Sequence, residues 1–89
     1  MAKKSKLEKI YKVDYEEGYY LFKLNSILDE KQVSKNSVIE KKNIDFNSIQ
    51  RLIKGELSRI DLGVIAKLCN ELNCHIEDIV EYINNDDTK

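Results

Sequence analysis

The side chains best suited to chemistry lie on the outward face of a short helix predicted to follow Asp45. Helical spacing turns Ile49 and Leu52 inward, together with Ile44 just ahead of the helix. The side chains left outside carry amide, hydroxyl, guanidinium and ammonium groups; they are Asn47, Ser48, Gln50, Arg51 and Lys54. Groups of these kinds hydrogen-bond to the base edges and phosphates of DNA. The pattern therefore favours a DNA-binding surface.

The segment 34–55 is predicted to form two short helices joined by a tight turn. Ser34 can cap the first helix and Asp45 the second, because each side chain can accept a hydrogen bond from a free backbone N–H group. Between the helices, Asn43 tolerates the left-handed conformation that such a corner requires. These features together predict a helix-turn-helix.

Three further apolar stripes at helical spacing predict one helix before this motif and two after it. The first helix should fade near Lys31 and Gln32, Asp61 should cap the fourth and Asn73 should close it. With Val38, Ile49 and Leu52, the stripes supply the predicted core: Leu21, Leu24, Ile27 and Leu28; Leu62, Ile65, Ala66, Cys69 and Leu72; and Ile76, Ile79, Val80 and Ile83.

The stretch 35–52 resembles the lambda-repressor-like, Cro/Xre-type helix-turn-helix family of phage and bacterial regulators. LFKLNSILDEKQV resembles the first helix of that family, and IDLGVIAKLCNELNCHIEDIVEYI resembles its two closing helices. The resemblance implies an all-α fold, a compact five-helix lambda-repressor-like DNA-binding domain at residues 21–83. A basic, Tyr-rich N-terminal extension (1–20) and a C-terminal tail (84–89) would flank it.

In that family the start of the second motif helix enters the major groove. By position, the resemblance implies base contacts from Phe46, Asn47, Ser48 and Arg51. Asn47 is suited to an adenine edge and Arg51 to a forked bond with guanine. Phe46 has two interpretations, a cover for a thymine methyl or a packing residue at the helix start. For Asn47 and Arg51 the alternative interpretation is a solvated polar face.

Phosphate contacts are expected around the same two helices. The resemblance places Lys35 against the sugar–phosphate backbone, where the hydroxyl and amide of its neighbours can add hydrogen bonds and the helix N-terminus attracts phosphate. Two further cations follow the reading helix. The expected phosphate contacts are thus Ser34, Lys35, Asn36, Lys54 and Arg59. Lys41 and Lys42 are interpreted as solubility charges.

The net charge of −1 is unevenly divided along the chain. The stretch 34–59 holds six basic and three acidic residues, whereas the stretch 60–87 holds one basic and seven acidic residues. Such a division presents a positive end to phosphate and leaves the other end in water. It is also compatible with an acidic face for a protein partner.

The cysteines and the single histidine do not predict an active site. Cys69 is expected to be a small buried hydrophobe, and Cys74 with His75 offers at most three metal ligands with no second cluster. His75 is expected to occupy the cap of the last helix, which leaves no base for a nucleophile. We therefore expect no enzyme, no metal and no cofactor.

Residues 1–20 leave three alternatives open. Lysines alternate there with apolar residues and are followed by four tyrosines. The segment can be a basic arm that reaches phosphates or a minor groove, or a frayed terminus. It can also form a strand at Tyr11–Tyr15, or again at Tyr19–Leu21, that pairs with another subunit.

The expected function is a sequence-specific, repressor-type transcriptional regulator that binds double-stranded DNA as a homodimer on a two-fold operator. The alternative is a protein-interaction module on the same fold, such as an antitoxin or antirepressor, that uses the acidic 60–87 face or the Tyr-rich start. No apolar run approaches the roughly 20 residues of a membrane helix. The basic first six residues are not followed by a signal-peptide stretch. We expect no membrane contact and a cytoplasmic location.

Overall fold

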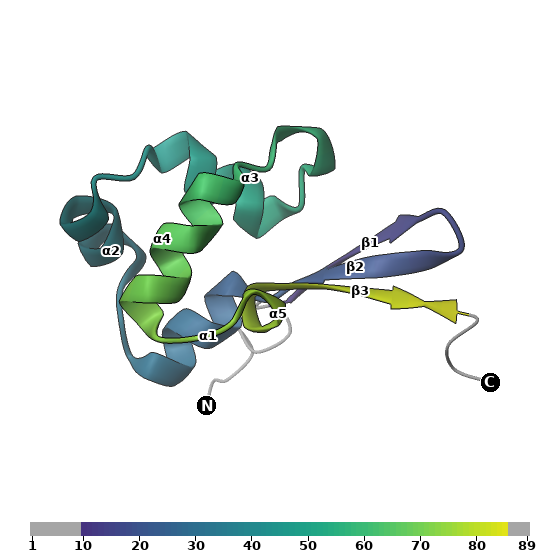
Figure 1. The fold of residues 1–89 in the computed structure, drawn as a ribbon, viewed down its shortest axis with the longest axis horizontal. Helices are drawn as coiled ribbons and strands as arrows, with labels where there is room; N and C mark the ends of the chain where they lie inside the picture. Colours follow the sequence, from purple (N-terminus) through teal and green to yellow (C-terminus); the bar gives the residue numbers. More distant parts are fainter. Residues whose placement is uncertain (1–9, 86–89) are drawn as a thin grey trace, which may run out of the picture.

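A computed structural model describes residues 10–85 of the chain. Figure 1 shows the helices gathered on one side and three strands projecting from them as an arm. In chain order the elements are β1 (Tyr11–Tyr15), β2 (Gly18–Phe22), α1 (Leu24–Lys31), α2 (Lys35–Lys42), α3 (Phe46–Lys54), the 3-10 helix η2 (Leu57–Arg59), α4 (Leu62–Leu72), α5 (Ile76–Ile79) and β3 (Val80–Asn84).

The expectation of an all-α fold is wrong, because the described residues include a three-stranded antiparallel sheet of order β1-β2-β3. Leu21 lies in β2 and not in α1, and α5 ends at Ile79, so that Val80 and Ile83 belong to β3. Their spacing fits a helix, but branched and aromatic side chains also suit a strand. In the folded chain, pairing with β2 supplies backbone partners that a four-residue helix could not offer.

The strands pair within the chain. Tyr20 stands opposite Tyr82, with ring centroids 4.9 Å apart, and the Tyr82 hydroxyl donates to the Tyr15 carbonyl oxygen at 3.1 Å. The ammonium of Lys23 lies 2.8 Å from the carboxylate of Glu81. Of residues 1–20, which the sequence left open, residues 11–20 therefore belong to a hairpin built into the domain, and residues 1–9 lie outside the described part of the chain.

The core lies between the sheet base and the helices. On α4 the predicted stripe was partly wrong, since Leu62 is 71% exposed and Ala66 is exposed, while Val64 and Leu68 are buried. Apolar residues occupy both faces near the start of this helix, so spacing alone did not fix which face turns inward. The buried hydrophobic residues are Phe22, Leu24, Ile27, Leu28, Val38, Ile44, Ile49, Leu52, Ile53, Val64, Ile65, Leu68, Leu72 and Ile79.

Gly55 joins α3 to the sheet. It ends the helix in the left-handed conformation, with φ at 73°. A Cβ atom added there would lie 2.7 Å from a methyl of Val13 and 2.9 Å from the ring of Phe22. Both the dihedral angle and the close approach therefore require glycine.

The corner between α4 and α5 holds the cysteines and the histidine. Asn73 closes α4 with φ at 53°, and the His75 backbone N–H donates to Asp78 Oδ2 at 2.9 Å, so both predicted caps are confirmed. Cys69 and Cys74 are free thiols, partly buried and packed against the core. Burial, with smaller effects from Cys69 and Asp78, raises the pKa of Cys74 to about 11.

We predict that Gly55→Ala lowers the free energy of unfolding by about 1–3 kcal/mol, through left-handed strain and overlap with Val13 and Phe22. Urea denaturation measures the change. Gly63→Ala is the matched control, because a Cβ there meets only the Asp61 side chain, at 3.2 Å, and the position is helical. Equal effects of the two substitutions would contradict the assigned role of Gly55.

We also predict that iodoacetamide modifies Cys74 at pH 8 about 100-fold more slowly in the folded protein than in urea, because a higher pKa leaves less thiolate. The folded state favours the protonated thiol, so the raised pKa of Cys74 adds to the free energy of unfolding. This contribution is fully present below pH 9.0 and is lost as the pH rises through about 11. Peptide fragmentation distinguishes Cys74 from Cys69. Equal rates in folded and unfolded protein would refute the raised pKa.

Candidate nucleic-acid interface

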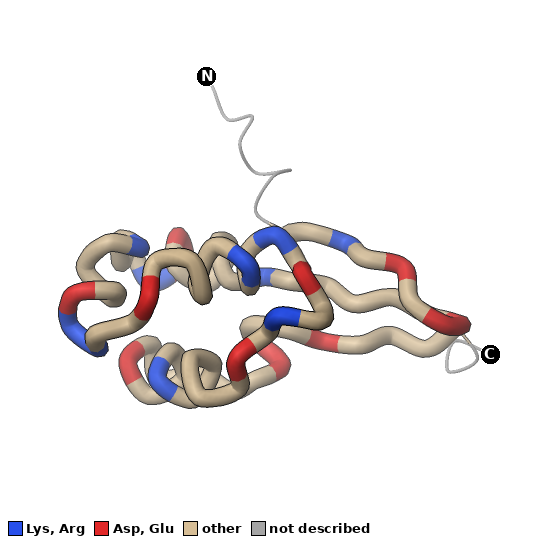
Figure 2. The backbone as a smooth tube through the Cα atoms, turned by 90° about the horizontal axis from the view of Figure 1, so that it is seen from above, with Lys and Arg blue, Asp and Glu red and all other residues tan. Residues whose placement is uncertain are grey.

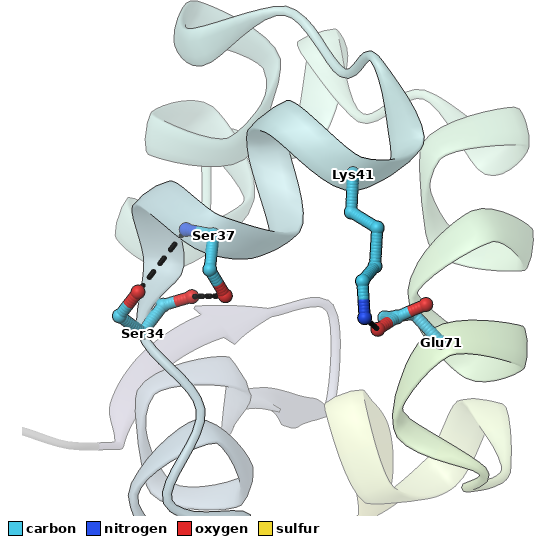
Figure 3. Close-up of polar contacts among 4 residues, drawn as sticks. All are labelled: Ser34, Ser37, Lys41 and Glu71. Carbon is cyan, nitrogen blue, oxygen red and sulfur yellow. Dashed lines mark hydrogen bonds and ion pairs between the residues drawn. The ribbon is translucent and has the colours of Figure 1, made fainter.

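The corner between α2 and α3 forms as its residues predict. The Ser34 hydroxyl accepts a hydrogen bond from the Ser37 backbone N–H at 3.1 Å (Figure 3), and Asp45 Oδ2 accepts from the Ser48 N–H at 3.1 Å. Asn43 ends α2 in the left-handed conformation, with φ at 54°. Both N-caps and the turn of the helix-turn-helix are therefore confirmed.

Helix α2 is also held from its other side. The Lys41 ammonium lies 3.0 Å from a Glu71 carboxylate oxygen on α4 (Figure 3), and the Lys67 ammonium donates to the Asn43 carbonyl oxygen at 3.5 Å. The first pair is largely exposed on the lysine side, so its contribution to stability is small. Lys41, interpreted as a solubility charge, thus has a partner on α4 and points away from α3.

The outer face of α3 is polar and accessible, as predicted. Ile49 is 0% exposed and Leu52 2% exposed beneath it, whereas Asn47 and Lys54 are exposed and Ser48, Gln50 and Arg51 are partly exposed. The inner side of α3 faces the core, and the end of the helix meets Val13 and Phe22 at Gly55.

A shallow depression of about 300 Å³ runs along this face. Three of the four residues expected to touch bases, Phe46, Asn47 and Arg51, line it together. Ser48 does not line it, and its backbone N–H serves the Asp45 cap. The remaining lining residues are Gln50, Lys54 and Glu56.

Lys35 bridges the two helices of the motif. Its ammonium donates to Gln50 Oε1 at 2.7 Å and lies 5.1 Å from the centroid of the Phe46 ring. Phe46 is 50% exposed and lies outside the buried core, so its ring is a surface feature stabilised by a cation. Gln50, outward in the sequence pattern but absent from the expected contacts, is brought into the site by this bond.

The other residues expected at phosphates surround the same corner. Ser34 and Asn36 are exposed at the start of α2, and Lys54 is exposed at the end of α3. Arg59 is exposed in η2 and does not line the depression. Figure 2 shows Lys and Arg positions gathered where β1 passes the helices and acidic positions at the tip of the β1–β2 hairpin.

Two kinds of site are absent from the part of the chain that the structure describes, a metal cluster and a membrane span. No three or more His, Cys, Asp or Glu side chains gather there as a metal would require. Among residues 10–85, the helices are all too short or too polar to cross a bilayer.

Comparison with known proteins gives one match. A family model described as a Cro/C1-type HTH DNA-binding domain matches residues 23–85, which is well over half of the chain. Neither the curated proteins nor the solved structures compared with the chain gave a match. The matched region includes β3 and ends at residue 85, whereas the sequence predicted that the domain ends at residue 83.

Proposed function

Because the chain belongs to the Cro/C1-type helix-turn-helix DNA-binding family, we propose that it is a sequence-specific transcriptional regulator of the repressor type that inserts α3 into the major groove. The observation that carries the proposal is the two-sided character of α3. Its inner side is fully buried at Ile49, and its outer side offers amide and guanidinium groups around one depression.

The dimensions of α3 suit this role. An α-helix with its side chains is about 10–12 Å across, and a major groove about 12 Å wide admits such a helix. Both helices of the motif are capped by their own side chains, so their orientation does not depend on the DNA. A preorganised reading helix loses little conformational entropy on binding.

Each base-contacting side chain has a proposed role. Asn47 pairs with an adenine edge, and Arg51 makes a forked bond to guanine. Phe46, half exposed with Lys35 against its ring, covers a thymine methyl. Ser48 lies beside them in the first turn of α3 and hydrogen-bonds to a base edge through its hydroxyl.

Phosphate contacts flank these residues. The hydroxyl of Ser34 accepts a bond from Ser37 and keeps its own hydrogen to donate to a phosphate oxygen. Lys35 and Asn36 lie at the same helix start, where backbone N–H groups favour an anion. Lys54 and Arg59 contact the backbone on the far side of α3.

We further propose that two copies bind a two-fold operator in the cytoplasm. One domain offers a single reading helix and so covers one half-site. Half-sites one helical turn apart then require a symmetric pair. The family match supports DNA binding, and the pairing is part of the proposal.

A protein-interaction role on the same fold is the second candidate, and a specific surface favours it. An apolar groove of about 320 Å³ lies between the sheet and the α4–α5 region. Leu62 on its rim is 71% exposed, Tyr15 50% and Ile76 47%. Exposed apolar side chains around one groove are typical of protein-binding surfaces.

Titration onto mixed genomic fragments at several salt concentrations tests the DNA-reading role. The parent should bind selected fragments, with affinity falling steeply as salt rises. Arg51→Ala should relax selectivity at one base position, by about 1–3 kcal/mol. Lys31→Ala, which removes an exposed cation from α1, should keep the parent's selectivity. Equally feeble, unselective binding by all three proteins would favour the protein-interaction role.

A further inference from the structure

A hollow lies beside α3, between β1 and the helix-turn-helix. Its volume is about 710 Å³. Four elements line it: β1 contributes Lys12, α1 contributes Asn25, α2 contributes Lys35, and α3 contributes Gln50 and Lys54. The predicted helix-turn-helix supplies only part of this lining, because β1 brings the rest from a distant part of the sequence.

The chemistry of the lining is that of an anion site. Three of its side chains carry an ammonium group, none carries a carboxylate, and Asn25 and Gln50 offer amide N–H donors. Both ion pairs recorded within residues 10–85 use other lysines, Lys23 and Lys41. Three lysines around one hollow, with no carboxylate among its lining residues, repel one another, and an anion held between them relieves that repulsion.

The lysines are positioned by their own contacts. The Lys12 ammonium lies 4.6 Å from the centroid of the Tyr19 ring on the neighbouring strand. Lys35 is held by its bond to Gln50. The strand β1 is itself fixed to the end of α3, since Val13 approaches Gly55 closely. The hollow is thus a built feature of the fold.

Its place on the surface indicates which anion it binds. Gln50 and Lys54 line this hollow and also the depression on the reading face, so the two adjoin along α3. A helix lying in a major groove has a sugar–phosphate strand along its flank. We propose that the hollow binds a backbone phosphate of the duplex that α3 reads, with Lys12 of β1 as a phosphate contact outside the helix-turn-helix; this rests on the proposed function.

Lys12→Ala is the test, with binding measured to a fixed DNA fragment across a series of salt concentrations. Loss of one phosphate contact should reduce the slope of log K against log salt by about 0.9, and should weaken binding about eightfold at 0.1 M salt. The loss should be the same for all sequences, because a phosphate carries no base identity. Lys12→Arg should restore the slope, and Lys31→Ala should not change it.

Two further measurements distinguish this inference from the proposed function and from the binding of a free anion. If Arg51→Ala loses selectivity while Lys12→Ala keeps the parent's salt slope, the inference is overturned and the proposed function stands. Salt-insensitive binding by every variant would contradict both the inference and the proposed function. Titration with inorganic phosphate, followed by the backbone amide resonances of Lys12 and Asn25, tests for a free anion. Saturation at low millimolar phosphate together with an unchanged DNA slope would assign the hollow to a small anion instead.

Discussion

The burial of Ile49 and Leu52 is the constraint on which the molecule depends. These two side chains fix the rotation of α3 about its axis, and that rotation alone decides that Asn47 and Arg51 face outward. The caps at Ser34 and Asp45 then set where each helix of the motif begins. The orientation of the polar outer face of α3 is in this sense set by the hydrophobic contact on its inner side.

The sheet changes how that surface is supported and how far it extends. Gly55 lets α3 end directly against Val13 and Phe22, so the hairpin packs on the reading helix and is not a loose arm. The same contact places Lys12 beside Lys35 and Lys54, although the first is far from the others in sequence. Three lysines therefore lie around one edge of α3, although the net charge of the whole chain is −1.

The helix-turn-helix and the outward face of α3 could be predicted because their signals are local. Ser34 reaches Ser37, Asp45 reaches Ser48, and Asn43 and Asn73 adopt the left-handed conformation within their own turns. The outward face of α3 follows from the same short-range periodicity. The hydrogen bond from Lys35 to Gln50 joins residues fifteen positions apart, and no local pattern indicates it.

The sequence by itself determined the caps, the corner and the polar face of the reading helix, because each depends on residues within about one helical turn. Only the tertiary structure decided that Val80 and Ile83 form a strand, that Leu62 faces outward and that Lys12 lines a hollow beside α3. Apolar spacing in those segments fits more than one element. Pairing with β2, and packing against a core assembled from distant residues, selects among them.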